Sequence, residues 1–145
     1  MNCFRVSLRP NVIETIEEEI YSTAADSPDG IVETGGWLWS PQDANWWAYG
    51  IDVAEASGPG LGAEKSYDSL ILPTEHLLDM DVLFRREHLE LSGGWHLHPG
   101  GDDMPSERDL DRIEKVLDLR AIWSPVLLAL LSSSLPVAVA MTAGQ

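Results

Sequence analysis

The chain has 145 residues, which is enough for one domain with a real hydrophobic core. Apolar residues make up 44% of the sequence, and this share excludes a disordered chain. Nine Lys and Arg stand against 24 Asp and Glu, for a formal net charge of -15, so nucleic acid and anionic membranes are not expected as partners. The acidity favours a neutral or basic protein partner, although solubility alone explains it equally well.

The expected compartment is the cytoplasm. The single cysteine, Cys3, cannot form an internal disulfide, and the N-terminus has no apolar run of signal-peptide length. The uncharged stretch 121–145 is broken by Pro125, by Pro136 and by three serines. Its two apolar halves therefore suit buried strands better than a membrane span of about 20 apolar residues, which stays the alternative.

Hydrophobic spacing and turn residues predict nine elements in chain order. They are a helix over 12–24, strands over 31–40, 46–56 and 69–73, a helix over 75–88, a strand over 91–98, a helix over 106–119, and strands over 121–131 and 136–142. In the first helix Ile13, Ile16 and Ile20 recur near helical spacing after Pro10. Because helices and strands alternate, the expected fold class is α/β, with one domain over 1–145 and a mixed β-sheet flanked by helices.

Two adjacent glycines interrupt the strand predicted at 31–40, in the stretch "ETGGWLW". Glycine inside a strand often marks a bulge or the close approach of another group. Three of the six tryptophans, Trp37, Trp39 and Trp95, flank the strands that carry the motif described next. Most tryptophans are expected in the core, although one or two of these could line a groove.

The stretch "GWHLHPGGDDMPSERD", residues 94–109, carries the candidate chemistry. Residues i and i+2 of a strand point to the same face, so His96 and His98 should present two imidazoles side by side, and neutral imidazole is a good zinc ligand. Ser106 and Asp109 resemble the start of a helix, where Ser is a favoured N-cap and an acid suits the positive helix end. Two imidazoles and the Asp109 carboxylate would leave a fourth position open, as in catalytic zinc sites.

Each half of this pattern also has a purely structural explanation. His-x-His occurs on strands by chance, and Ser-x-x-Asp is a common capping pattern. The combination is more specific: His-x-His followed by Pro, with Ser seven residues after the second His and Asp three further on. On its own, Glu33 would be interpreted as an exposed acid on an edge strand.

The joint pattern "HLHPGGDDMPSERD" resembles the JAMM motif of the JAB/MPN zinc metalloproteases, whose architecture is similar to that of cytidine deaminases. The family pattern also includes an upstream glutamate, and "ETGGWLW" has Glu33 in that place. The resemblance extends over about residues 31–131 and is greatest to short prokaryotic JAB-domain proteins. It implies that His96, His98 and Asp109 are Zn2+ ligands. It further implies that Glu33 is the general base and acid and that Ser106 is the oxyanion donor.

The resemblance further implies a bacterial zinc isopeptidase or peptidase. Its substrate would be a ubiquitin-like or sulfur-carrier protein with a small-residue C-terminal tail, bound as an added strand, and E1-like or E2-like proteins are further candidate partners. The alternative is a non-catalytic JAB/MPN binding or scaffold module, although every motif position is filled in this chain. A zinc nucleobase deaminase is set aside, because that chemistry needs a Cys-x-x-Cys pair and the chain has one cysteine.

Overall fold

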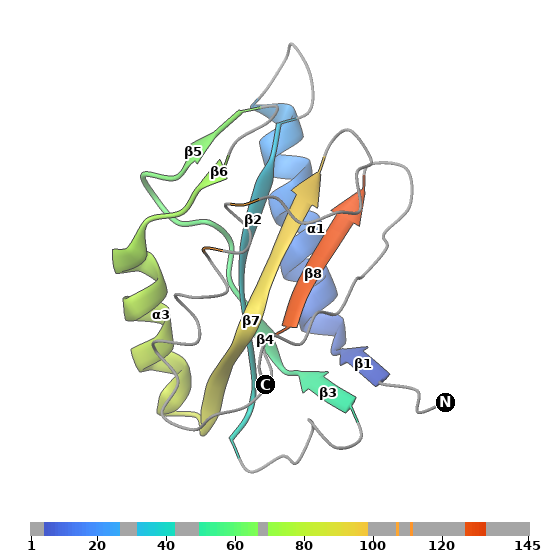
Figure 1. Cartoon of the computed structure of the whole chain (residues 1–145), viewed down its shortest axis with the longest axis vertical. Coiled ribbons are helices and arrows are strands. Elements are labelled where there is room, and N and C mark those ends of the chain that lie inside the picture. The colour runs from blue at the N-terminus through green and yellow to red at the C-terminus, as the bar shows by residue number, and fades with distance from the viewer. Residues whose placement is uncertain are drawn as a thin grey trace.

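The computed structural model describes residues 5–26, 32–42, 50–66, 70–98 and 127–132, together with Glu107 and Asp111. A four-stranded sheet in the order β4-β2-β7-β8 lies at its centre (Figure 1). Its strands are β2 (Thr34–Pro41), β4 (Glu55–Ala56), β7 (Leu89–His98) and β8 (Leu127–Ser132). β2 pairs antiparallel with β4 and β7, whereas β7 and β8 are parallel. The expected mixed sheet is therefore confirmed.

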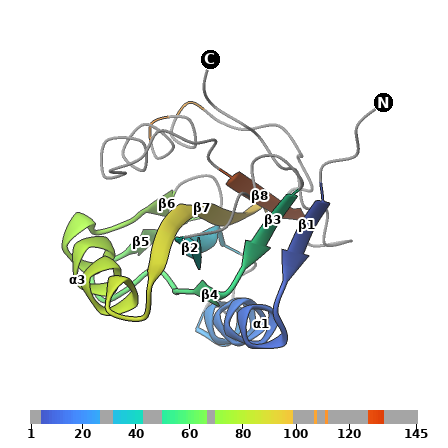
Figure 2. The same cartoon turned by 90° about the horizontal axis from the view of Figure 1, so that it is seen from below.

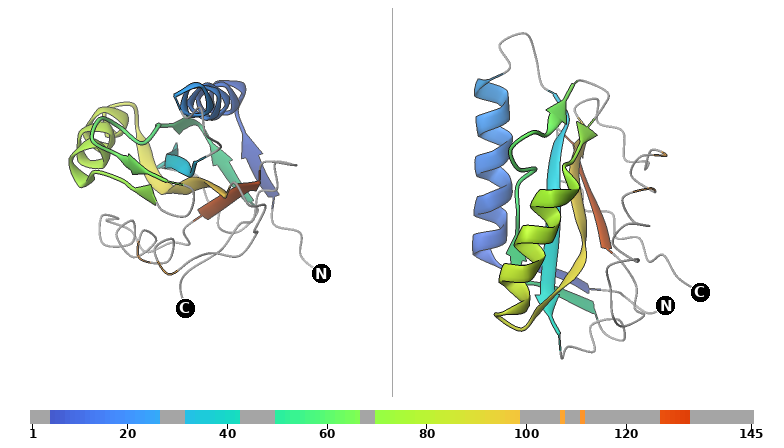
Figure 3. Two further views of the ribbon diagram at one scale, coloured as in Figure 1. Left: turned by 90° about the horizontal axis from the view of Figure 1, so that it is seen from above. Right: turned by 90° about the vertical axis from the view of Figure 1, so that its left-hand side faces the viewer.

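Two smaller strand pairs and two helices surround this sheet. The strand pairs are parallel β1 (Arg5–Leu8) with β3 (Gly50–Val53), and antiparallel β5 (Glu64–Lys65) with β6 (Leu70–Ile71). The helices are α1 (Pro10–Ala25) and α3 (Thr74–Arg85). Figures 2 and 3 show α1 along one face of the sheet. The other helix, α3, lies apart from α1 and beside β7. This mixture of helices and strands is of the α/β class.

The first helix is close to its prediction at 12–24. It begins slightly earlier, at Pro10, because the fixed φ of proline suits the first turn of a helix. Its buried side is slightly rotated from the expected one: Val12 and Ile16 are buried, whereas Ile13 is 43% exposed. Within the described part of the chain, neither helix has the length and apolarity needed to cross a membrane.

The second helix was predicted over 75–88 and ends earlier, at Arg85. A turn follows it, in which His88 has a φ of 61°, a left-handed conformation that does not continue a right-handed helix. His88 is exposed, and it lies at the opposite end of β7 from His98.

The strand predicted over 46–56 is wrong as a single element, because its described part forms two strands in different sheets. β3 pairs with β1, and β4 pairs with β2. The break falls at Ala54, whose N–H donates to the carbonyl of Trp39 at 2.8 Å. Neither β1 nor β5 was predicted, and in the described part of the strand predicted over 69–73, residues 70–73, only β6 is a strand.

The C-terminal predictions are only partly covered by the structure. The strand predicted over 121–131 is represented by β8. The helix predicted over 106–119 lies outside the described residues, except for Glu107 and Asp111, which are both helical and exposed. Residues 99–105, between the strand that ends at His98 and this predicted helix, lie outside them entirely, as does the strand predicted at 136–142.

The central sheet has an apolar core on each face. The core beneath α3 includes Trp37, Trp39, Leu77 and Leu91. The core beneath α1 includes Val12, Ile16, Leu38 and Trp95. All three of these tryptophans are at most 3% exposed, so they are core residues and line no exposed groove.

The side chains of β7 do not alternate without interruption. Leu91 pairs with Trp39, whereas Gly93 pairs with Leu38, so Ser92 is an extra residue in the ladder between β2 and β7. This is a β-bulge, and an extra residue reverses the direction of every side chain that follows it. Leu91 and the residues after Gly93 therefore do not share one continuous period-two alternation, which was the pattern expected over 91–98.

The bulge decides which face of the sheet carries the histidines. Ser92 is held by two hydrogen bonds inside the sheet: its Oγ donates to the carbonyl of Leu38 at 3.2 Å and accepts from Ser40 Oγ at 3.0 Å. After the bulge, Trp95 points toward α1. His96 and His98 consequently point to the opposite face.

Candidate metal centre

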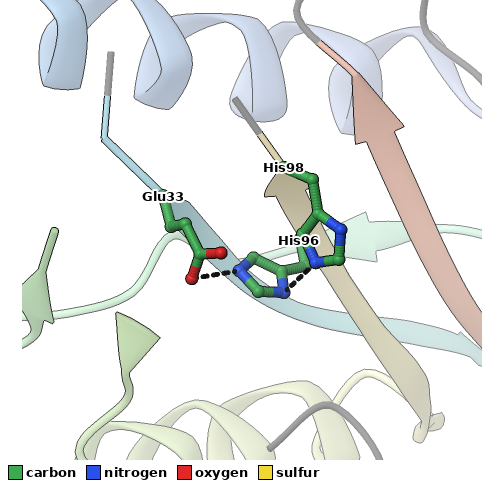
Figure 4. A group of neighbouring side chains, drawn as sticks. All are labelled: Glu33, His96 and His98. Carbon is green, nitrogen blue, oxygen red and sulfur yellow. Dashed lines mark hydrogen bonds and ion pairs between the residues drawn. The ribbon is translucent and has the colours of Figure 1, made fainter. Parts of the chain in front are cut away.

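Two buried histidines stand at the end of β7, as the His-x-His spacing predicted. β7 lies between β2 and β8, and His96 and His98 are only 2% and 7% exposed. Their ring centroids are 4.5 Å apart and the ring planes are nearly perpendicular, at 86°. Nε2 of His98 lies 3.2 Å from Nδ1 of His96 (Figure 4). The two rings are thus held edge to face within a protected part of the sheet.

Glu33 reaches the same place from the residue just before β2. Gly35 pairs with His96 across the two strands, and Glu33, two residues earlier, points to the same face. Glu33 Oε2 lies 3.2 Å from Nε2 of His96, and the side chain is 13% exposed (Figure 4). The interpretation of Glu33 as an exposed acid on an edge strand is wrong, because its side chain is largely buried and lies against His96.

The glycines of "ETGGWLW" permit this close packing. A Cβ atom on Gly36 would overlap the carbonyl group of Ser57, and one on Gly35 would meet the carbonyl oxygen of Trp95. The close approach that the paired glycines predicted is therefore present. Leu70 of β6 also lies against Gly35, so an apolar side chain borders the position opposite His96.

The two imidazoles have a spacing that suits a tetrahedral metal ion. Ligand atoms that are each about 2.0–2.1 Å from a tetrahedral zinc ion lie about 3.3 Å from one another. Nδ1 of His96 and Nε2 of His98 are 3.2 Å apart. Glu33, His96 and His98 each offer one possible ligand atom, and these three atoms lie within 4.8 Å of one another. The described group can therefore hold a metal ion, and the spacing of its two nitrogens suits zinc.

Glu33 also indicates which nitrogen of His96 carries the ring proton. A carboxylate only accepts hydrogen bonds, so the 3.2 Å contact places the ring proton of neutral His96 on Nε2. The lone pair of Nδ1 then points to the side where His98 lies. Metal-binding histidines are commonly oriented by a carboxylate in this way. The geometry thus gives Glu33 a direct contact with a candidate ligand, on the Nε2 side of its ring.

The remaining predicted site residues, Ser106 and Asp109, lie outside the described residues. The structure thus brings together three of the five predicted residues, and the oxyanion donor and the third zinc ligand stay predictions from the sequence.

A polar cluster behind this site was not predicted. We name it the Glu19 cluster: Glu19 and Thr23 of α1, Thr34 of β2 and Lys65 of β5. Glu19 Oε1 accepts from Thr23 Oγ1 at 2.8 Å, from Thr34 Oγ1 at 2.8 Å and from Lys65 Nζ at 2.9 Å. Burial alone would raise the pKa of Glu19, but the hydrogen bonds and the charge of Lys65 lower that pKa below its ordinary value. The available signal was a glutamate and a threonine four residues apart on one side of a helix.

No protein-family model and no curated protein sequence matches the chain. Among solved structures, the solution structure of protein DSY2949 from Desulfitobacterium hafniense has a similar fold, with a TM-score of 0.57 and 17% sequence identity. The match covers 91% of this chain and 77% of that protein. At this identity the similarity concerns the fold alone, and it agrees with the α/β arrangement described above.

Proposed function

We propose that the protein is a JAMM-type zinc metallopeptidase with the JAB/MPN architecture. It would cleave the amide or isopeptide bond that follows the C-terminal tail of a ubiquitin-like or sulfur-carrier protein. One observation carries the proposal: Glu33, which is 63 residues away from His96 in the chain, lies beside it in space. The His-x-His stretch by itself does not require this contact, whereas the proposed chemistry needs an upstream carboxylate next to the histidines.

The roles of the individual residues follow from their chemistry. His96 and His98, with Asp109 as the predicted third ligand, would hold a zinc ion that acts as a Lewis acid and lowers the pKa of water to about 7. Glu33 would accept a proton from the attacking water and return it to the amine nitrogen that leaves. Ser106 would donate a hydrogen bond to the carbonyl oxygen as negative charge develops on it.

The substrate class is supported by general features of the chain. A tail of small residues can be recognised through its main chain, since an extended peptide pairs with a strand without needing large side-chain pockets. The net charge of -15 favours a substrate protein with a neutral or basic surface. E1-like and E2-like proteins are further candidate partners through the same family resemblance.

The proposal is tested with zinc-loaded protein and a set of ubiquitin-like and sulfur-carrier proteins whose C-terminal glycine is joined to a lysine-containing peptide. We expect cleavage directly after that glycine, measured by mass spectrometry, loss of cleavage with a chelator, and its return with added zinc. The matched control is the double variant His96→Ala plus His98→Ala. Zinc-loaded wild-type protein that binds a carrier protein and leaves every bond intact would refute the peptidase and favour the scaffold module.

A further inference from the structure

The Glu19 cluster connects three elements at a single carboxylate oxygen. Thr23 is on α1 with Glu19, but Thr34 belongs to the start of β2 and Lys65 to β5. Lys65 Nζ also donates to Thr23 Oγ1 at 3.0 Å, so the donors contact one another as well. The side chains of Glu19 and Lys65 are only 18% and 26% exposed. The ion pair is therefore only partly buried, and such a pair is weak evidence of a gain in stability.

The elements joined by Glu19 are the ones that hold Glu33. Glu33 lies one residue before the ladder between β2 and β7, whose end pair is Thr34 with Leu97. Its N–H donates to the carbonyl of Ser66 at 2.7 Å. Thr34 follows Glu33 directly in the chain. Ser66 follows Lys65 directly in the chain. Glu19 therefore binds Thr34, which follows Glu33 directly in the chain. It also binds Lys65, which directly precedes Ser66, the hydrogen-bond partner of Glu33.

The directions of the side chains explain how this tether acts on the metal centre. Neighbouring residues in extended backbone point to opposite faces, so Thr34 points toward α1 while Glu33 points toward His96. A hydrogen bond that fixes Thr34 on the α1 side consequently fixes the direction from which the Glu33 carboxylate leaves the backbone on the other side.

We propose that Glu19 is a positioning residue: through Thr34 and Lys65 it fixes the backbone at Glu33 and so holds the Glu33 carboxylate against His96. The effect on turnover rests on the proposed function, whereas the effect on the Glu33 backbone does not. Glu19 does not contact His96 or His98 in any described hydrogen bond, so it acts only through Glu33.

The test compares Glu19→Ala with the conservative Glu19→Gln and with Glu18→Ala, which removes an exposed carboxylate from the same helix. We expect Glu19→Ala to lower kcat by between about 10-fold and 100-fold, the range that a misplacement of up to about 1 Å can cost, with an unchanged KM. Glu19→Gln keeps an acceptor oxygen for Thr34 and should lose less. Glu18→Ala should behave as wild type.

Two further measurements separate positioning from a general loss of stability. In a Glu33→Gln background, Glu19→Ala should cause no additional loss of turnover, because residues that act through one group are not additive. Amide hydrogen exchange, followed by NMR in the metal-free protein, should be faster at the Glu33 N–H in Glu19→Ala and unchanged in the middle of β7. That second readout does not depend on any enzymatic activity.

Each outcome decides the inference. A Glu19→Ala enzyme with wild-type kcat overturns it, as does a further loss of turnover in the Glu33→Gln background. If zinc-loaded wild-type protein cleaves nothing, the proposed function fails, and the exchange rate of the Glu33 amide alone decides whether Glu19 positions it. If Glu19→Ala does not fold by circular dichroism, Lys65→Met replaces it with the same readouts, since it removes one tether and leaves the bond between Glu19 and Thr34.

Discussion

Replacing Glu33 with Gln separates proton transfer from the orientation of His96. The side chain keeps its volume, but the amide cannot accept the proton of a water molecule. The charged hydrogen bond from His96 Nε2, 3.2 Å long, contributes about 1.5–3 kcal/mol, and a neutral one about half as much. The amide of the Glu33→Gln variant still offers a carbonyl oxygen to that nitrogen, so the loss is about 1 kcal/mol. Zinc affinity should therefore fall by only about 5-fold to 10-fold.

Turnover should fall much further than zinc affinity. Loss of a general base typically costs about 10²–10⁴ in rate. The assay is turnover at zinc concentrations well above the dissociation constants of both proteins, which are measured by competition with a chromophoric chelator. Under those conditions both sites are full and only the chemical step differs. Glu18→Gln provides a control with the same change of charge on the exposed side of α1.

Two results would refute this reasoning. A zinc-saturated Glu33→Gln enzyme with nearly wild-type turnover would show that another group is the base, and Asp102 and Asp103 of the motif loop would be the next candidates. A loss of zinc affinity of 100-fold or more, with turnover restored once the site is filled, would assign Glu33 the orientation of His96 alone, since removing such a carboxylate typically costs about 10–100-fold in metal affinity.

Four further predictions follow from the site and its surroundings. Protein purified without chelator should contain one zinc ion per chain by metal analysis, and full occupancy surviving His96→Ala plus His98→Ala would disprove the ligand assignment. Ser106→Ala should lower kcat by about 10²–10³ at similar KM if Ser106 donates to the oxyanion, and Ser106→Asp should be worse; an active Ser106→Asp enzyme would leave only a capping role, worth about 1 kcal/mol in thermal unfolding. The lowered pKa of Glu19 means that the folded state prefers its ionised form. The stability that this carboxylate contributes is therefore present above the ordinary carboxyl range and is lost as pH falls through the folded pKa. Glu19→Gln should make the free energy of unfolding, measured with urea, fall less steeply in acid. Gly36→Ala should destabilise the protein by at least about 1–3 kcal/mol, because its methyl group meets a backbone carbonyl, and unchanged unfolding would contradict the packing at β2.

The elements that could be predicted are those with a strong local pattern. The helix that begins at Pro10 has apolar residues at helical spacing, and the strand ending at His98 was predicted, although its alternation is interrupted at Ser92. The bulge at Ser92 could not be predicted, because it depends on which residues of β2 stand opposite. The short strands β1 and β5 were missed for the same reason, since four or two residues become strands only through a partner distant in the chain.

The candidate site shows a similar division. The pairing of His96 with His98 follows from strand geometry alone, whereas the approach of Glu33 was expected only through a family resemblance. Nothing in the local sequence distinguishes Glu33 from a solvated acid. Glu19 was missed because its partners, Thr34 and Lys65, come from separate segments, and no local pattern indicates which donors will meet a carboxylate on a helix.

The distance of 63 residues between Glu33 and His96 has a consequence for the biogenesis of the protein. During synthesis β2 emerges long before β7, and contacts that close long loops form late in folding because their entropic cost precedes any gain. Until β7 has paired with β2, the carboxylate and the imidazoles are unrelated parts of the nascent chain. Short metal-binding modules can be folded by the ion itself, since their ligands lie close together in sequence. The ligands proposed for this chain, His96, His98 and Asp109, also lie close together in sequence. An ion can therefore bind them before the sheet is complete, and only the approach of Glu33 must wait until β7 has paired with β2.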